Sequence, residues 1–360
     1  MNRNAMPIPA PRRQRGLSLV EIMVAVTVSV ILLAGVLQIF AGTKTSYRLQ
    51  ENTGRLQENG RFALDFLTRD IRMAGYRGCN PTAPISNTLN NPNSLAYDFT
   101  TGITGFDNIT TAPAMMAALV PAPAANTDAI VIRRAVGNPV RVTRNNDAAQ
   151  LFAEVTSTVN GACPDGSDKI SDICNGDILM VSDCRFARIF QTNNIQVAGG
   201  ELNIVHPAAG TPGNAISSWG GAAAPPEEKF DKNAEIIKVG TFGYYVGVRG
   251  DGMPALYRVE GNQAFELVEG VEDMQIVYGE DTNADRTADV YRSANQVANW
   301  DNVVSARINL LLRSIDNNLT NTPQGYTFNG TTVAATSLPA TDRYLRREFS
   351  ATVTLRNRAQ

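Results

Sequence analysis

Residues 12–21 read Arg-Arg-Gln-Arg-Gly-Leu-Ser-Leu-Val-Glu, and a nearly unbroken apolar run at 22–41 follows them directly. Within this run only Thr27, Ser29 and Gln38 are polar, and no residue is charged. At about 1.5 Å per residue the run forms a helix of roughly 30 Å, which matches the hydrocarbon core of a bilayer. The sequence therefore predicts one membrane-spanning helix near the N-terminus.

The charges ahead of the run predict its orientation. Four arginines and no acidic residue precede the glycine of this stretch: Arg3, Arg12, Arg13 and Arg15. By the positive-inside rule they keep the N-terminus in the cytoplasm, so the rest of the chain is expected across the membrane. A secretory signal peptide is the alternative, but its small-residue cleavage site follows the apolar region. Here Gly16 precedes that region.

Glu21 is the one acidic residue at the start of the span. A carboxylate at or within the membrane costs about 2.5 kcal/mol or more on insertion scales unless it is paired or reaches the interface. A plain uncleaved anchor would give this residue no role. We therefore interpret Glu21 as functional.

Residues 15–21 resemble the class III signal of type IV prepilins and pseudopilins, with basic leader, glycine, glutamate and apolar run in register. The resemblance implies that a prepilin peptidase cleaves after Gly16 and methylates the amino group of Leu17. Most members carry phenylalanine where this chain has Leu17. Cleavage would create a terminal amine, and in a filament Glu21 of an incoming subunit could pair with the amine of its neighbour. That pairing would set the axial register.

The predicted helix continues beyond the membrane to about Gly75. An apolar stripe at helical spacing runs through Leu49, Leu56, Ala63, Leu67, Ile71 and Ala74. Such a stripe usually packs on the sheet of its own domain, and a coiled-coil partner is the alternative. The expected organisation is a leader at 1–16, a transmembrane and filament-core helix at 17–42, an amphipathic helix at 43–78 and a periplasmic β-rich pilin domain at 79–360.

The remainder of the chain has the pattern of strands separated by polar and Gly/Pro-rich loops. Strands are expected at 128–133, 176–181, 187–190, 236–248, 255–259, 265–278, 303–313 and 349–355. Long surface loops are expected at 80–126, with room for one short strand, and at 207–229. A long helix followed by strands predicts a type IV pilin-like α+β fold, with the helix packed on an antiparallel sheet.

Several segments of the second half resemble the PilW family of minor pilins. They are 269–275, 278–279, 300–307, 311–314 and 352–357, together with 73–76 at the expected end of the helix. The resemblance implies a minor subunit that primes type IV pilus assembly with other minor pilins and lies at or near the tip. Its implied partners are those minor pilins, the major pilin, the prepilin peptidase and the inner-membrane assembly platform. The implied location is the inner membrane, with a periplasmic domain, and then the pilus of a Gram-negative bacterium.

Two other functions remain open at this point. A pseudopilin of type II secretion shares the N-terminal signal, and an adhesin or DNA-uptake subunit could share the fold. The formal net charge is −2, which argues against nucleic-acid binding because that usually needs a concentrated basic patch. The arginines near the C-terminus are expected on the solvated face of terminal strands: Arg343, Arg346, Arg347, Arg356 and Arg358.

All four cysteines follow the predicted span: Cys79, Cys163, Cys174 and Cys184. An even number in an oxidising compartment favours disulfides. Metal binding is the alternative, but no CxxC pair is present and the only histidine is His206. Three connectivities are available, of which we favour Cys163–Cys174, closing a short polar loop, and Cys79–Cys184, tying the helix end to the sheet.

One loop could bind a metal ion. Asp281, Asn283, Asp285 and Asp289 alternate in the manner of a calcium loop, but Arg286 replaces its glycine and Arg292 its twelfth-position glutamate. A polar hairpin loop is the alternative, and no other cofactor is indicated. We expect no enzymatic activity, because the sequence has no nucleophile elbow, phosphate loop or zinc spacing, and His206 is expected to be solvated.

Overall fold

The computed structural model describes residues 16, 18–157 and 161–358. Its longest element is helix α1 (Leu19–Arg72), and the chain forms two compact units, residues 1–52 and 53–360. Within the described residues of the first unit the chain is helical from Leu19 onward, and its apolar side chains are exposed. α1 is the one helix in the described part of the chain that is long and apolar enough to cross a membrane. This agrees with the predicted span at 22–41.

In the second unit, one face of α1 is buried as the stripe predicts. Leu56 is 5 % exposed, and Ala63, Leu67 and Ile71 are fully buried in the main hydrophobic core. The helix ends where two glycines follow, and Gly75 adopts a φ of +68° while its N–H donates to the carbonyl of Arg133. A left-handed residue after the last turn is a usual helix stop.

Within the described residues the strands form four sheets. The largest contains β1 (Ile85–Asn87), β2 (Ile103–Phe106), β3 (Ala129–Arg141), β5 (Ile178–Ser182), β6 (Ala187–Gln191), β9 (Glu235–Val248), β10 (Pro254–Glu260) and β11 (Gln263–Glu269). The second contains β12 (Val271–Glu280), β13 (Val290–Ser293), β14 (Val303–Arg313) and β17 (Arg346–Thr354). The small sheets are β4 (Gln150–Glu154), β7 (Asn194–Ala198) and β8 (Glu201–Val205), and the hairpin β15 (Tyr326–Phe328) and β16 (Thr331–Val333).

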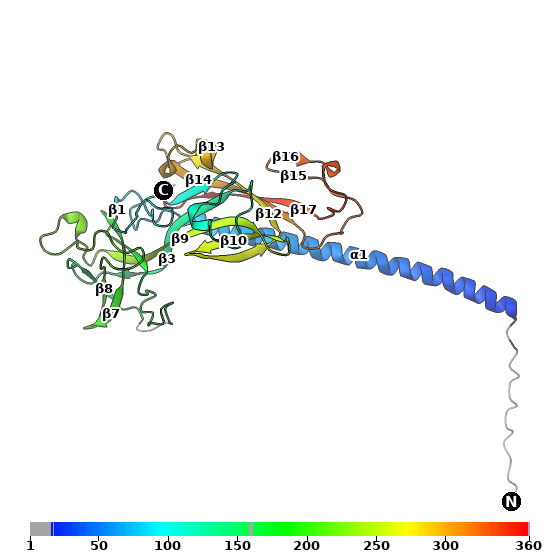
Figure 1. The fold of residues 1–360 in the computed structure, drawn as a ribbon, viewed down its shortest axis with the longest axis horizontal. Coiled ribbons are helices and arrows are strands. Elements are labelled where there is room, and N and C mark those ends of the chain that lie inside the picture. Colours follow the sequence, from blue (N-terminus) through cyan, green and yellow to red (C-terminus); the bar gives the residue numbers. More distant parts are fainter. Residues whose placement is uncertain (1–15, 17, 158–160, 359–360) are drawn as a thin grey trace, which may run out of the picture. The chain divides into compact units, whose positions relative to one another are not determined.

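Short 3-10 helices occupy some of the connections. They are η1 (Ala114–Met116), η2 (Pro226–Glu228), η3 (Ala294–Gln296), η4 (Trp300–Asn302) and η5 (Ala335–Ser337). In the second unit, β7–β8 and β15–β16 lie at opposite ends, and the C-terminal part of α1 runs beside the larger strands (Figure 1).

Strand β9 organises the large sheet. It pairs antiparallel with β3 on one edge, and with β5 and then β10 on the other. The predicted β9–β10 hairpin is confirmed, with Val248 opposite Pro254. The β13-β12-β14-β17 sheet shares one core with α1, β3, β9 and β10. The α+β architecture with antiparallel sheets is therefore confirmed, although β1 and β6 pair in parallel.

The predicted continuous strand at 265–278 is wrong. Gly270 interrupts it with a φ of +84°, and β11 and β12 on either side belong to different sheets. A Cβ at Gly270 would lie 2.7 Å from the carbonyl oxygen of Arg313. The position therefore requires glycine both for its backbone conformation and for this close approach.

The segment 80–126 is not the surface loop that its composition predicts. It contributes β1, β2 and η1, and residues along it are buried in three of the four hydrophobic clusters: Leu89, Phe99, Ile103, Ile109, Met116 and Leu119. The expected loop at 207–229 also contributes to a core, because Trp219 is 2 % exposed. Apolar residues in both segments recur with neither helical nor strand periodicity, so the polar and Gly/Pro-rich composition dominates the prediction.

Candidate functional site

Helix α1 begins with a reciprocal pair of hydrogen bonds. The N–H of Ser18 donates to Oε2 of Glu21 at 3.0 Å, and the N–H of Glu21 donates to Oγ of Ser18 at 3.2 Å. This is a capping box, in which each side chain satisfies a backbone donor that the first turn leaves unpaired. The Glu21 carboxylate thus points back toward the chain end, where it also meets the positive pole of the helix dipole.

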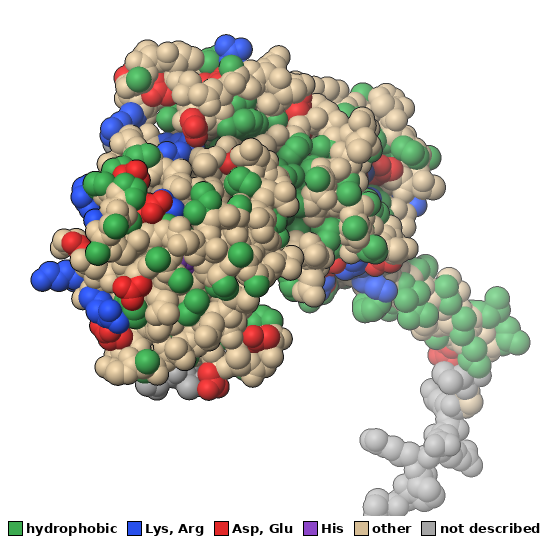
Figure 2. Space-filling view, turned by 60° about the vertical axis from the view of Figure 1, so that its left-hand side comes forward, with side chains coloured by type: hydrophobic (Ala, Val, Ile, Leu, Met, Phe, Trp, Pro, Cys, Tyr) green, Lys and Arg blue, Asp and Glu red, His purple; other side chains and the backbone are tan. Residues whose placement is uncertain are grey.

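The other residues of the predicted processing site are described only in part. Gly16 is exposed, and Leu17 lies outside the described residues. After these residues, the large apolar side chains between Leu19 and Phe40 are each at least 50 % exposed. Figure 2 shows hydrophobic side chains gathered over this helical unit. The polar Thr27 is satisfied locally, because its hydroxyl donates to the carbonyl of Met23 at 2.8 Å.

In the second unit, α1 packs closely against a sheet at Gly60. A Cβ there would lie 2.6 Å from ring carbons of Phe349 on β17, so only glycine fits without a shift. Next to it, Asn59 donates its side-chain amide to the carbonyl of Glu269 at 3.1 Å. These contacts anchor the helix to both large sheets.

A buried polar cluster fixes the last turn of α1. Asp70 is 5 % exposed, and its Oδ2 accepts the hydroxyl of Tyr244 on β9 at 2.6 Å. Its Oδ1 lies 2.9 Å from Nε of Arg134 on β3. Burial, with the Asp70 charge beside it, raises the pKa of Tyr244 well above its usual value, so the hydroxyl stays a donor.

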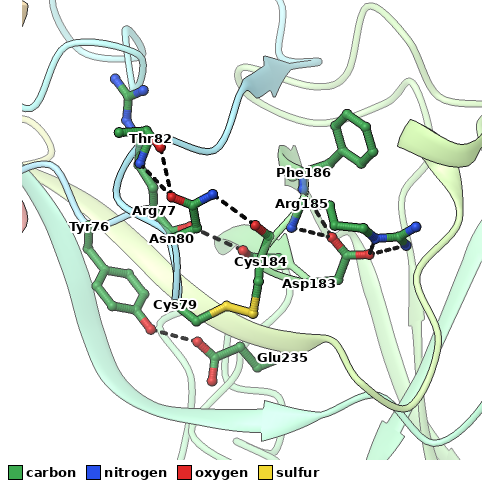
Figure 3. Close-up of a disulfide and its surroundings, with 11 residues drawn as sticks. Tyr76, Arg77, Cys79, Asn80, Thr82, Asp183, Cys184, Arg185, Phe186 and Glu235 are labelled. Atoms are coloured by element: carbon green, nitrogen blue, oxygen red, sulfur yellow. Dashed lines mark hydrogen bonds and ion pairs between the residues drawn. A yellow bond between two sulfur atoms is a disulfide. The ribbon is translucent and has the colours of Figure 1, made fainter.

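Directly after the helix, a disulfide joins Cys79 to Cys184 in the turn between β5 and β6 (Figure 3). Two hydrogen bonds lie beside it. Asn80 donates its side-chain amide to the carbonyl of Cys184 at 3.1 Å, and the Tyr76 hydroxyl donates to Glu235 at 2.6 Å. The second disulfide, Cys163–Cys174, closes a short loop. This is the connectivity that the spacing favoured.

The loop that follows β12 shares some backbone features with a calcium-binding loop. Asp281 accepts the N–H groups of Asn283 and Arg286, and Arg286 adopts a φ of +68° at the position where a calcium loop carries glycine. Among the described residues, however, no group of three or more His, Cys, Asp or Glu is arranged to hold a metal ion. At the twelfth position Arg292 instead pairs with Glu280 at 3.0 Å.

Two predictions about exposed polar residues are wrong. His206 is fully buried and stacks on Trp219, with ring centroids 4.2 Å apart, and burial lowers its pKa to about 4. Arg346 is not on a solvated face: its side chain is 5 % exposed and Nε lies 2.6 Å from Glu272. Arg358 is similarly enclosed, with its side chain 9 % exposed. The sequence around a single arginine or histidine does not predict which distant residue will bury or pair with it.

Comparison with known proteins matches two parts of the chain. Residues 243–357, which run from within β9 past β17, match a family described as Type IV Pilus-assembly protein W. Residues 11–37 match the Prokaryotic N-terminal methylation motif and include Gly16, Leu17 and Glu21. No curated protein and no solved structure matches the chain.

Proposed function

Because this chain belongs to the PilW family of type IV pilus assembly proteins and carries the N-terminal methylation motif, we propose that it is a minor pilin that helps to initiate pilus assembly. In this proposal it is incorporated at or near the pilus tip and supports pilus biogenesis, twitching motility and adhesion. The protein acts as a structural subunit, and its family indicates no enzymatic activity.

The observation that carries the proposal is the register of the N-terminal residues. Gly16 is followed by a helix whose apolar side chains are exposed and whose only acid in the first turn is Glu21. Such a surface needs either lipid or neighbouring apolar helices around it. A leader that can be removed after Gly16 allows the same helix to use both environments in succession.

The proposal has three steps. The chain first lies in the inner membrane with its sheets in the periplasm, and the leader holds the orientation. A prepilin peptidase then cleaves after Gly16 and methylates Leu17. Finally the inner-membrane assembly platform transfers the subunit from the lipid into the filament. There the helix packs against the helices of other minor pilins and of the major pilin.

Deletion of the gene tests the proposal. We expect surface pili and twitching motility to be lost or strongly reduced, and to return on complementation with the wild-type chain. Mass spectrometry of the mature protein should give an N-terminus at methylated Leu17. Normal pilus numbers with a loss of exoprotein secretion would favour a pseudopilin of type II secretion. A mature chain that begins elsewhere would contradict filament entry by this route.

A further inference from the structure

The two disulfides differ in their exposure to solvent. Cys79 and Cys184 are both exposed, whereas Cys163 and Cys174 are 5 % and 6 % exposed. Thiol–disulfide exchange requires a thiolate to reach one of the two sulfurs, so access controls its rate. A reductant can therefore attack Cys79–Cys184 in the folded protein, while Cys163–Cys174 is shielded.

The residues around the exposed Cys79–Cys184 disulfide also favour thiol–disulfide exchange. Cys79 and Cys184 line a pocket of about 350 Å³ together with Arg141, Lys232 and Glu235. Glu235 accepts a hydrogen bond from the Tyr76 hydroxyl, so the lining of this pocket combines the two cysteines with two cations and one hydrogen-bonded carboxylate. Positive charge beside a leaving thiolate stabilises it and speeds exchange.

Both cysteines are held in place independently of the bond between them. Asn80 bridges to the carbonyl of Cys184, and Tyr76 bridges to Glu235 (Figure 3). β1 also pairs with β6 close to both cysteines in sequence. Breaking the disulfide therefore leaves the two thiols near each other, so the bond can form again.

We propose that Cys79–Cys184 is a reversible exchange site for a dithiol redox protein of the compartment in which the sheets lie. A thiolate of the dithiol attacks one sulfur, which forms a mixed disulfide and releases the other cysteine as a thiolate beside Arg141 and Lys232. The second thiol of the dithiol then attacks the mixed disulfide. This second attack releases the remaining cysteine as a thiolate. The dithiol is thereby oxidised by two electrons and Cys79 and Cys184 are reduced, and the two protons that the dithiol gives up to solvent are matched by the two that the cysteine thiolates take up.

Limited reduction of the full chain in detergent micelles tests the site. The native protein is treated with limiting dithiothreitol at neutral pH, quenched with N-ethylmaleimide at intervals and mapped by mass spectrometry. We expect Cys79 and Cys184 to be alkylated at least about tenfold faster than Cys163 and Cys174, because access limits the exchange. Equal rates, or faster reduction of Cys163–Cys174, would overturn the proposal.

Charge variants test the role of the pocket. The Arg141→Gln and Lys232→Gln substitutions together should slow reduction of Cys79–Cys184 severalfold, with Cys163–Cys174 as the internal reference. Lys229→Gln is the matched control, since it removes one positive charge that does not line the pocket and should leave the rate unchanged. A double variant that reacts at the wild-type rate would contradict the assigned role of the two cations.

Re-oxidation tests whether the site is reversible. After removal of dithiothreitol, oxidised glutathione should restore the Cys79–Cys184 bond, and the aromatic part of the near-ultraviolet circular dichroism signal should stay constant throughout. Loss of that signal on reduction, or failure of the bond to form again, would show that the disulfide holds the local fold together and would overturn a reversible site.

Discussion

Gly60 of α1 lies directly against the ring of Phe349, so closely that a Cβ at Gly60 would be 2.6 Å from the ring carbons. Gly60→Ala should therefore destabilise the protein, although alanine is the better helix former by about 1 kcal/mol. Overpacking at such a contact typically costs about 1–3 kcal/mol, which exceeds that gain. Chemical denaturation of the variant measures the net effect.

Gly54 offers the matched control for this experiment. It lies on the same helix and is exposed, and outside the backbone of its own helical turn no atom lies within 4 Å of the position that a Cβ would occupy there. Gly54→Ala should therefore stabilise the protein by up to about 1 kcal/mol through helix propensity alone. If Gly60→Ala were equally stabilising, the helix and β17 would not be in the close contact described.

The Asp70 cluster predicts a graded loss of stability. Asp70→Ala leaves Arg134 as an uncompensated cation in a largely buried position, which costs about 3–5 kcal/mol. Tyr244→Phe removes one hydrogen bond and keeps the ion pair, so a loss of about 1–2 kcal/mol is expected. Asp65→Ala, on the exposed face of the same helix, should change the free energy of unfolding by less than about 0.5 kcal/mol. Equal losses for Asp65→Ala and Asp70→Ala would contradict the cluster.

Asp128 predicts a pH dependence of stability. It is 2 % exposed at the start of β3, and burial raises its pKa to about 7, although the N–H groups of Asn108 and Ile276 donate to its carboxylate. Between about pH 4 and 7 the folded state then binds more protons than the unfolded state, so stability falls as pH rises through this window. The slope is at most about 1.4 kcal/mol per pH unit.

The comparison for Asp128 is Asp128→Asn, which cannot titrate. The free energy of unfolding of the wild type, measured relative to this variant, should decrease from pH 5 to pH 7 and level off above that. A difference that stays constant across the range would mean that Asp128 is ionised throughout in the folded protein.

The sequence predicts those parts of the fold that depend on residues close together in the chain. The apolar stripe of α1 and the β9–β10 hairpin are examples, because a helix face or a two-strand turn is encoded within a short window. The requirement for glycine at position 60 comes from the ring of Phe349, which lies near the other end of the chain. The burial of His206 likewise depends on stacking against Trp219, in a segment whose composition predicts a loop. Such partners are defined only by the folded chain.

The residues of the candidate site are also predicted from the sequence only in part. Glu21 stands out from sequence because a charge at the start of an apolar run is costly, but its exchange of hydrogen bonds with Ser18 was missed. The Ser-x-x-Glu spacing of a capping box was present as a signal. In the 281–289 loop the spacing was visible, whereas the arrangement of its carboxylates was not.

Calcium should not stabilise the 281–289 loop. Both Oδ atoms of Asp281 and Oδ2 of Asp289 already accept loop donors, and no group of three acidic or histidine ligands converges among the described residues. We expect millimolar calcium to leave the thermal melting temperature unchanged. A rise in melting temperature that disappears in Asp285→Ala would instead identify a calcium site.

Glu21 should be required for entry into the filament and not for processing. Glu21→Ala removes both the capping acceptor and the charge that would pair with the terminal amine of a neighbouring subunit. We expect the variant to be cleaved after Gly16 and retained in the membrane, but to be absent from sheared pili. Normal levels of Glu21→Ala in sheared filaments would refute the pairing.

Two further variants separate the charge of Glu21 from its role in the capping box. Glu21→Gln keeps an acceptor that suits a capping box but has no charge, and Ser18→Ala removes the cap, at a cost of about 1 kcal/mol, while it keeps the charge. If pairing with the amine drives assembly, Glu21→Gln is absent from pili like Glu21→Ala, and Ser18→Ala is incorporated. Mass spectrometry of the mature N-terminus must show equal cleavage in all variants, because a processing defect would also keep a subunit out of the filament. The reverse pattern, with Glu21→Gln incorporated and Ser18→Ala excluded, would assign Glu21 to helix capping instead.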